Sequence, residues 1–174
     1  MNHRPNQDEY AAYYHNYIAL VPDADLLRNL RHIHHETQEL IWNLPEEKGN
    51  YRYAEGKWTI KEVLIHLIDT EQIMAYRALS IARKDQTSLP GFDQNDYVEA
   101  VDVSGRSLKS LAEEYAVTRD MSYVMFKHFD KATFERVGIA NGNKMSVRAL
   151  AHIVIGHEIH HLSVLKEKYL NGRR

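Results

Sequence analysis

The chain has 174 residues, of which 44% are hydrophobic and 26% charged, and its formal net charge is −2. These values fit one globular domain over residues 1–174 and argue against electrostatic capture of nucleic acid or an anionic membrane. The sequence contains no cysteine, which excludes disulfides, thiolate ligands and a protein thiol nucleophile. The polar N-terminus lacks a signal segment and no apolar run approaches the ~20 residues that span a bilayer, so we expect a cytoplasmic protein.

Four segments show the three- and four-residue apolar spacing of amphipathic helices. We predict helices over residues 23–44, 59–83, 107–129 and 146–170. Asp23 and Pro45 suit the start and stop of the first helix, and Asn171-Gly172 suits the end of the fourth. The second begins with Thr59-Ile-Lys-Glu62, a capping-box pattern in which the two end residues satisfy each other's backbone N–H groups.

The connections between these helices differ in length. Residues 84–106 form a long connection, with a short helix expected near 93–101, and connections of this length are often functional. Residues 130–145 contain the turn-like Asn141-Gly142-Asn143, while strand patterns are weak throughout. We therefore predict an all-α four-helix bundle with a long loop between the second and third helices.

The fourth predicted helix carries the most informative string, Gly156-His157-Glu158-Ile159-His160-His161. His157 and His161 are four residues apart, so their side chains share one helix face with Leu150 and Ile153. Two imidazoles with this spacing can close on one metal ion. Core histidines satisfied by hydrogen bonds are the competing interpretation, and a pair alone does not decide between the two.

A third histidine on another helix favours the metal interpretation. His66 borders the apolar side of the second helix and shares a face with Thr70, Ile73 and Arg77. Bundle cores commonly assemble metal ligands from facing helices, and three imidazoles with an open position match catalytic zinc geometry. Imidazole also suits nickel, copper and iron. We expect His160 and the group His32, His34 and His35 to be surface side chains.

The string His157-Glu158-x-x-His161 also matches the HExxH pattern of zinc proteases, in which the glutamate is the general base. A third ligand would have to come from downstream, where Glu167 is the only carboxylate and lies too far along the same helix. The extended form of the motif also fails, because Val164 stands in place of its glycine. We therefore do not favour a protease.

At these residues the chain resembles the DinB/YfiT-like superfamily of bacterial proteins. The resemblance rests on YRYAEGKWTIKEVLIHLIDTEQIMAYRALSIARKDQTSLPGFDQNDYV and on MSVRALAHIVIGHEIHHLSVLKEKY. It implies a four-helix bundle, often a homodimer, with a metal held by one histidine of the second helix and a His-x-x-x-His pair of the fourth. These positions are His66, His157 and His161. Some members resemble enzymes that use low-molecular-weight thiols such as bacillithiol or mycothiol.

We therefore expect a divalent metal, zinc first and nickel second, in an S-transferase that acts on a small molecule with an external thiol. Arg77 would bind a carboxylate of the thiol cofactor. The imidazoles would be oriented by one or more of three carboxylates, namely Asp69, Glu71 and Glu158. A metal-dependent hydrolase and a non-enzymatic metal-binding protein remain alternatives. The loop residues Phe92, Asp93, Asp96 and Tyr97 either cover the metal pocket or pack at a dimer interface.

Overall fold

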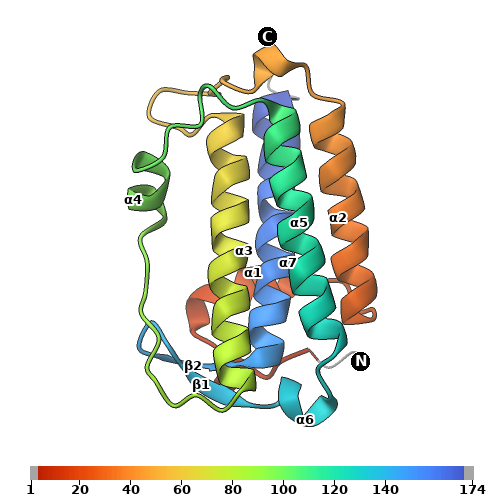
Figure 1. The fold of residues 1–174 in the computed structure, drawn as a ribbon, viewed down its shortest axis with the longest axis vertical. Helices are drawn as coiled ribbons and strands as arrows, with labels where there is room; N and C mark the ends of the chain where they lie inside the picture. Colours follow the sequence, from red (N-terminus) through yellow and green to blue (C-terminus); the bar gives the residue numbers. More distant parts are fainter. Residues whose placement is uncertain (1–3, 171–174) are drawn as a thin grey trace.

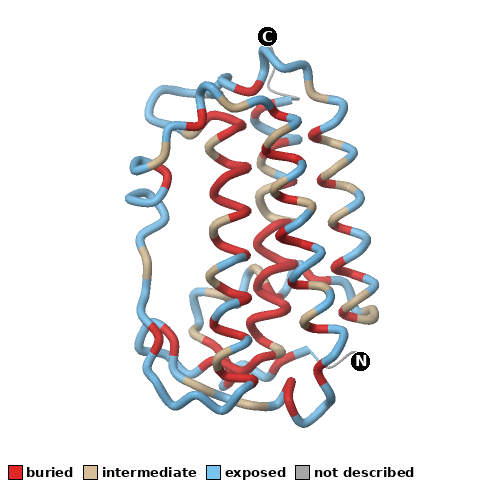
Figure 2. The backbone as a smooth tube through the Cα atoms, viewed as in Figure 1, coloured by how far each residue is buried: buried red, intermediate tan, exposed pale blue. Residues whose placement is uncertain are grey.

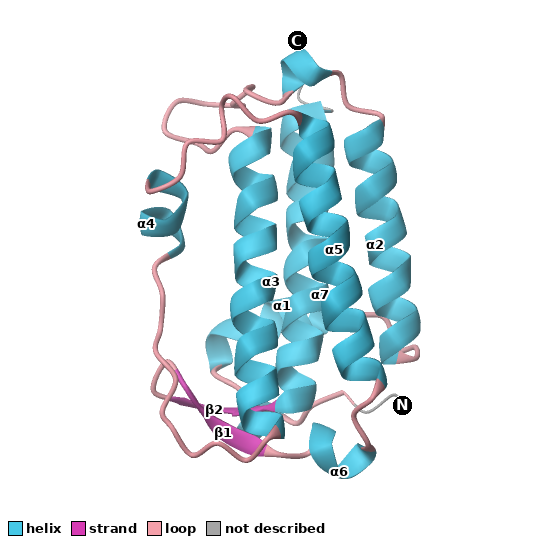
Figure 3. Ribbon diagram, in the orientation of Figure 1, coloured by secondary structure: helices cyan, strands magenta, loops and turns pink. Residues whose placement is uncertain are grey.

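The computed structural model describes residues 4–170. Its framework is four long helices, namely α2 (Leu26–Trp42), α3 (Ile60–Ala82), α5 (Leu108–Lys127) and α7 (Val147–Val164), which stand side by side (Figures 1 and 3). The predicted four-helix bundle is therefore confirmed. None of the described helices combines the length and apolar character that crossing a membrane requires.

Side-chain caps set where these helices begin. The capping box of α3 forms as predicted: Thr59 Oγ1 accepts from the Glu62 N–H at 3.1 Å, and Glu62 Oε2 accepts from the Thr59 N–H at 2.6 Å. Helix α2 begins three residues later than predicted, because the Asp25 side chain accepts from two backbone N–H groups of its first turn. Beyond α7 the chain continues as a π-helical turn, η4 (Leu165–Leu170), and the predicted end at Asn171-Gly172 lies outside the described residues.

The packing order of the helices explains the long connection. Helix α3 packs against α5 and α7, and α2 packs against the same two helices. Figure 1 shows that α3 and α5 run in the same direction. The chain must therefore travel back along the bundle before α5 can begin, and it does so through the connection that carries α4 (Gln94–Glu99), with Asp93 as its N-cap.

The second connection contains strands that the weak strand patterns of the sequence did not predict. It contains α6 (Lys131–Phe134) and an antiparallel hairpin of β1 (Val137–Ala140) and β2 (Asn143–Ser146). Asn141 and Gly142 join the strands with φ of 50° and 69°, the backbone of a tight hairpin turn. Each strand has only four residues, too few for a clear alternating pattern. The long connection also bonds to the hairpin, because the Leu89 N–H donates to the Ile139 carbonyl at 3.0 Å.

Three short elements before α2 were also not predicted. They are η1 (Gln7–Glu9), η2 (Ala12–Tyr14) and α1 (His15–Leu20), and a fourth short element, η3 (Glu46–Lys48), precedes α3. Helix α1 packs against α7. Buried residues follow the inward sides of the long helices and continue into the short elements at the hairpin end of the bundle (Figure 2).

Candidate metal centre

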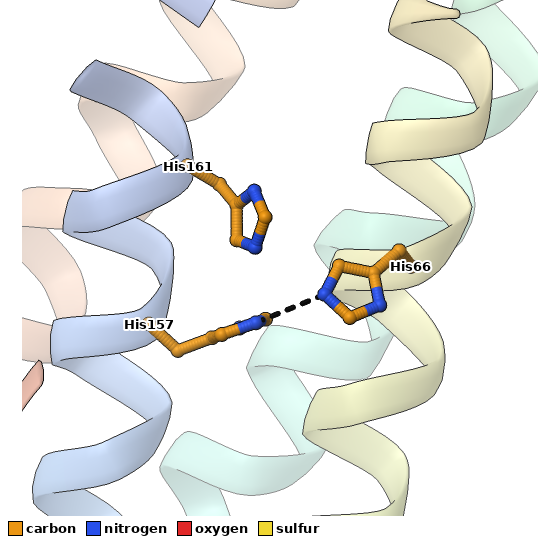
Figure 4. Close-up of side chains that lie close together, drawn as sticks. All are labelled: His66, His157 and His161. Carbon is orange, nitrogen blue, oxygen red and sulfur yellow. Dashed lines mark hydrogen bonds between the residues drawn. The ribbon is translucent and has the colours of Figure 1, made fainter. Parts of the chain in front are cut away.

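Two of the three predicted ligands lie one turn apart on α7. Ser146 caps this helix by accepting from the Ala149 N–H at 3.0 Å. The residues of its first turns are almost all apolar and are buried. His157 is 8% exposed and His161 is half-buried, and both rings point toward α3 (Figure 4). Their ring centroids lie 4.5 Å apart.

The third predicted ligand, His66, meets this pair from α3 and is 2% exposed. Its ring centroid lies 4.9 Å from that of His157 and 4.9 Å from that of His161. The Nε2 atoms of His66 and His157 are 3.0 Å apart, and each of the three residues offers a ring nitrogen within 4.8 Å of the others (Figure 4). The structure thus brings together the three imidazoles that the sequence selected from two distant segments.

The surroundings of the three rings keep them neutral. Burial lowers the pKa of His66 to about 4. Burial, together with the neighbouring His66 and His160, lowers the pKa of His161 to about 3. The same effects hold the pKa of His157 well below its ordinary value, with burial as the largest cause. A neutral imidazole has the free lone pair that a metal ion requires.

The donor set fits a divalent transition metal. Zinc binds imidazole nitrogen at about 2.0–2.1 Å with tetrahedral geometry, which places the donor atoms about 3.4 Å apart. The observed separations, from 3.0 Å up to 4.8 Å, bracket that value. Figure 4 shows the His161 ring with Nε2 directed toward His66 and His157. The other ring nitrogen, Nδ1, is buried and has no hydrogen-bond partner among the described residues, which costs free energy. Thr70 Oγ1 lies 3.4 Å from His66 Nδ1, so His66 Nε2 is the nitrogen that faces the pair.

A cavity of about 340 Å³ opens beside His66 and His157. Along α3 it is lined by Thr70 and Met74, and at the hairpin end by Asn141 and Asn143. The other walls are the start of α4 with the residues before it, the N-terminal segment, and parts of β1 and α7, which contribute Phe92, Asp93, Gln94, Asn95, Ala11, Tyr13, Tyr14, Tyr17, Ala140 and Ile153. This volume suits a small-molecule ligand.

The family of the chain follows from comparison with known proteins. The model of the DinB superfamily matches residues 29–165, which include all three histidines.

This chain belongs to the DinB superfamily.

A protein of Oceanobacillus iheyensis that carries the name "Putative metal-dependent hydrolase" is 26% identical over 140 residues, covering 74% of each chain. The structure of YfiT from Bacillus subtilis, described as "a probable metal-dependent hydrolase with an unusual four-helix bundle topology", superposes with a TM-score of 0.74. That likeness covers 95% of this chain and 91% of YfiT at 12% identity, and it shows a shared fold.

The N-terminal wall of the cavity lies outside the matched part of this DinB protein, and nothing in the sequence pointed to it. Tyr17 packs edge-on against the rings of His157 and His160, with centroids 5.5 and 5.4 Å away. A side chain at Gly156 would overlap the Tyr17 carbonyl, so glycine lets α1 approach α7 beside His157. Arg148 holds the same segment by pairing with Glu9. His160, expected at the surface, is half-buried under Tyr17.

Two of the carboxylates expected to orient the imidazoles instead bind a buried arginine. Arg119 of α5 is 2% exposed and donates to Glu71 Oε1 at 2.9 Å and to Glu71 Oε2 at 2.8 Å. It also pairs with Glu158, whose other oxygen accepts from Tyr115 and, at 2.6 Å, from Thr37. This network joins all four long helices. Glu158 is therefore held away from the three imidazoles, which argues further against the protease interpretation.

The remaining predicted site residues have clear positions. Asp69 is half-buried, and burial together with the charge of Glu114 raises its pKa. Arg77 is 3% exposed, beyond Met74 on α3. In the long connection, Phe92 and Asp93 line the cavity, which agrees with the alternative that this loop covers the metal pocket. Tyr97 is 46% exposed and packs on Phe92.

The lowered pKa values predict how the metal-free protein responds to acid. The unfolded chain takes up protons on histidine near pH 6.5, whereas folded His66 does so only near pH 4. Folding stability is therefore full above pH 6.5 and is lost as the pH falls toward 4, by roughly 3 kcal/mol for His66 alone. Urea unfolding of metal-free protein between pH 7 and 5, where most carboxylates stay ionised, should register about 2 kcal/mol of this loss.

The substitution His66→Gln should flatten this pH dependence, and His35→Gln, at a side chain that is 81% exposed, is the matched control. Equal slopes for wild type and His66→Gln would contradict the prediction.

Proposed function

We propose that the protein is a metal-dependent enzyme that acts on a small molecule, with His66, His157 and His161 as the ligands of one divalent transition metal, zinc first and nickel second. The observation that carries the proposal is the convergence of three neutral imidazoles, two of which, His66 and His157, line a cavity of about 340 Å³. The name of the Oceanobacillus iheyensis relative supports metal dependence as well.

We further propose that the nucleophile is an external low-molecular-weight thiol and that the enzyme is an S-transferase. When bound, the metal would supply positive charge and an open coordination position, which favour loss of the thiol proton. The chain itself holds the imidazoles neutral, and the cavity walls would orient the two reactants. The carboxylate beside the histidine pair, Glu158, is bound by Arg119 and Tyr115, so a nucleophile that needs no protein carboxylate as base suits this site. A thiol co-substrate fits a reducing compartment such as the cytoplasm.

Hydrolysis is the second candidate, because the relative and YfiT both carry hydrolase names. Water would then replace the thiol as the nucleophile. Asp93 is the carboxylate that lines the cavity and is the residue to examine as a base in that case. A metal-binding protein without catalysis would retain the metal and turn over neither class of substrate.

The deciding experiment compares zinc-loaded wild type with zinc-treated His161→Ala. Each is assayed for conjugation of 1-chloro-2,4-dinitrobenzene with bacillithiol, mycothiol, glutathione and cysteine, and for hydrolysis of 4-nitrophenyl acetate. We expect zinc-dependent conjugation with at least one thiol, lost in His161→Ala and kept in His160→Ala. Zinc-dependent ester hydrolysis without conjugation would replace the transferase with the hydrolase. Full zinc occupancy with neither activity would contradict both enzymatic proposals.

We also propose that two copies associate through an exposed apolar patch on α3 and α5. The patch consists of side chains that are 39–71% exposed although apolar, namely Tyr76, Leu79, Val117, Met121 and Val124. Along the two helices, Asp69 and Glu113 precede these side chains and Arg83 and Lys127 follow them. Helices α3 and α5 run in the same direction. A twofold axis perpendicular to both helices therefore places the acidic residues of one copy against the basic residues of the other.

Met121→Lys should therefore convert a dimer into a monomer, because it places a charge in the centre of the patch. Sedimentation equilibrium measures the mass. Trp42→Lys, at another exposed apolar side chain on α2, is the control and should leave the dimer intact. A monomeric wild type, or a Met121→Lys variant of unchanged dimeric mass, would contradict the proposal.

A further inference from the structure

The cavity is elongated along α3. His66, Thr70 and Met74 line it at four-residue spacing, so it follows one face of the helix. With a rise of 1.5 Å per residue, the levels of His66 and Met74 are about 12 Å apart. The metal centre therefore stands at one end of a long cavity, and a ligand that fills it has a second end well away from the reacting group.

Arg77 stands behind that second end. Helical side chains lean toward the helix N-terminus, which brings the Arg77 guanidinium back to the level of Met74. Its Nη1 lies 3.6 Å from Met74 Sδ, and its carbon Cζ lies 5.6 Å from the centre of the Phe92 ring. Met74 and Phe92 both line the cavity, so the guanidinium is one side chain away from a bound ligand.

The charge of Arg77 is not balanced locally. It is 3% exposed, and its Nη2 donates to the Pro90 carbonyl at 2.6 Å. Within the part of the chain that the structure describes, its contacts are a carbonyl, a thioether, a ring and the Tyr14 hydroxyl, and none is a carboxylate. A buried cation is normally paired, because removing it from water costs several kcal/mol. Arg119 shows the usual solution in this same bundle, with two carboxylates around it.

Tyr14 and Asp93 also affect the electrostatic potential at the Arg77 end of the cavity. Tyr14 lines the cavity; burial raises the pKa of its hydroxyl, and the positive charge of Arg77 acts against that rise. The hydroxyl can therefore donate to an anion while Arg77 stabilises it from behind. Asp93 is the one carboxylate in the lining, but it is exposed to water and its side chain accepts from the Asn95 N–H at 2.7 Å. Water screens an exposed charge far more than a buried one, so Arg77 dominates.

We infer that the cavity takes a two-ended ligand, with a metal-binding group at the three histidines and a carboxylate about 12 Å away, held by the Tyr14 hydroxyl and the Arg77 charge. This rests on the proposed metal site and deepens the proposed function, because it assigns the thiol a distant carboxylate. A thiol with its carboxylate close to the sulfur would reach only one end.

The test measures binding to cobalt-substituted protein by the change in its visible absorption. Each ω-mercapto acid is paired with the alcohol of equal length. The short pair is 3-mercaptopropionate and 3-mercapto-1-propanol, and the long pair is 8-mercaptooctanoate and 8-mercapto-1-octanol. The long pair spans about 10 Å between sulfur and the terminal carbon, at ~1.25 Å per bond along an extended chain. We expect the long acid to bind at least tenfold more tightly than the long alcohol, and the short pair to bind equally.

In Arg77→Met the long acid and the long alcohol should bind with nearly equal affinity, while the short alcohol keeps its wild-type affinity. Arg77→Lys should restore part of the preference, and Tyr14→Phe, which keeps the buried cation, should weaken it. Equal binding of the long acid and long alcohol to wild type, or a preference that survives in Arg77→Met, would overturn the inference.

A second metal-binding group separates this inference from the proposed thiol chemistry. Suberic acid monohydroxamate is compared with its methyl ester on the same cobalt protein. If thiols fail to bind but the hydroxamate acid is preferred over the ester, the inference stands and the thiol proposal falls. If the short thiols bind but neither long acid is preferred, only the inference falls. If neither head group binds, both fail.

Discussion

Replacing Arg119 with methionine should lower the free energy of unfolding by about 3–5 kcal/mol, because it leaves two buried carboxylates without their cation. Glu71 and Glu158 are 4% and 2% exposed, and the guanidinium contacts both. It also donates to the Leu30 carbonyl at 3.2 Å, so α2 loses a contact as well.

Urea unfolding at pH 7 measures the effect, with Arg28→Met at an exposed position of α2 as the control. The triple variant Arg119→Met/Glu71→Gln/Glu158→Gln removes all three charges and should recover part of the loss. A loss below 1 kcal/mol for Arg119→Met, equal to that of Arg28→Met, would show that the network does not stabilise the bundle.

Replacing His161 with alanine should weaken zinc binding by more than ~100-fold, beyond what loss of an outer hydrogen bond to a metal ligand costs. Only two imidazoles would remain, and two ligands rarely hold zinc at a protein site. The metal-free variant should be as stable as metal-free wild type or more so, because the buried, unpartnered Nδ1 atom is gone. The defect is therefore specific to the metal.

Competition with a zinc indicator measures the affinity, and urea unfolding without metal measures the stability. His160→Ala is the matched control on the same helix, since His160 packs against Tyr17 and is not one of the three converging residues. Wild-type zinc affinity in His161→Ala, or an equal loss in His160→Ala, would contradict the assignment.

The framework and the three imidazoles could be predicted because their signals are local or periodic. The capping pair Thr59 and Glu62 and the cap Ser146 mark helix starts in the sequence. His157 and His161 share a face by their spacing, and His66 borders an apolar stripe, so convergence followed from the bundle.

The cavity walls and the buried network could not be predicted because long-range contacts decide them. The N-terminal segment is fixed by Arg148, which pairs with Glu9 across 139 positions of sequence, and by the space at Gly156. Arginine is rarely buried unless it is paired, so the sequence places Arg119 at the surface. Its carboxylate partners come from two other helices and are therefore not visible in the local sequence. Glu158 follows His157 directly and therefore points about 100° away around the helix.

The most direct test of the central claim is X-ray absorption spectroscopy of the zinc-loaded protein together with its zinc content. We expect one zinc per chain with three imidazole nitrogens at about 2.0–2.1 Å. Protein that binds no zinc, or a zinc environment with fewer imidazoles that is unchanged in His161→Ala, would contradict it.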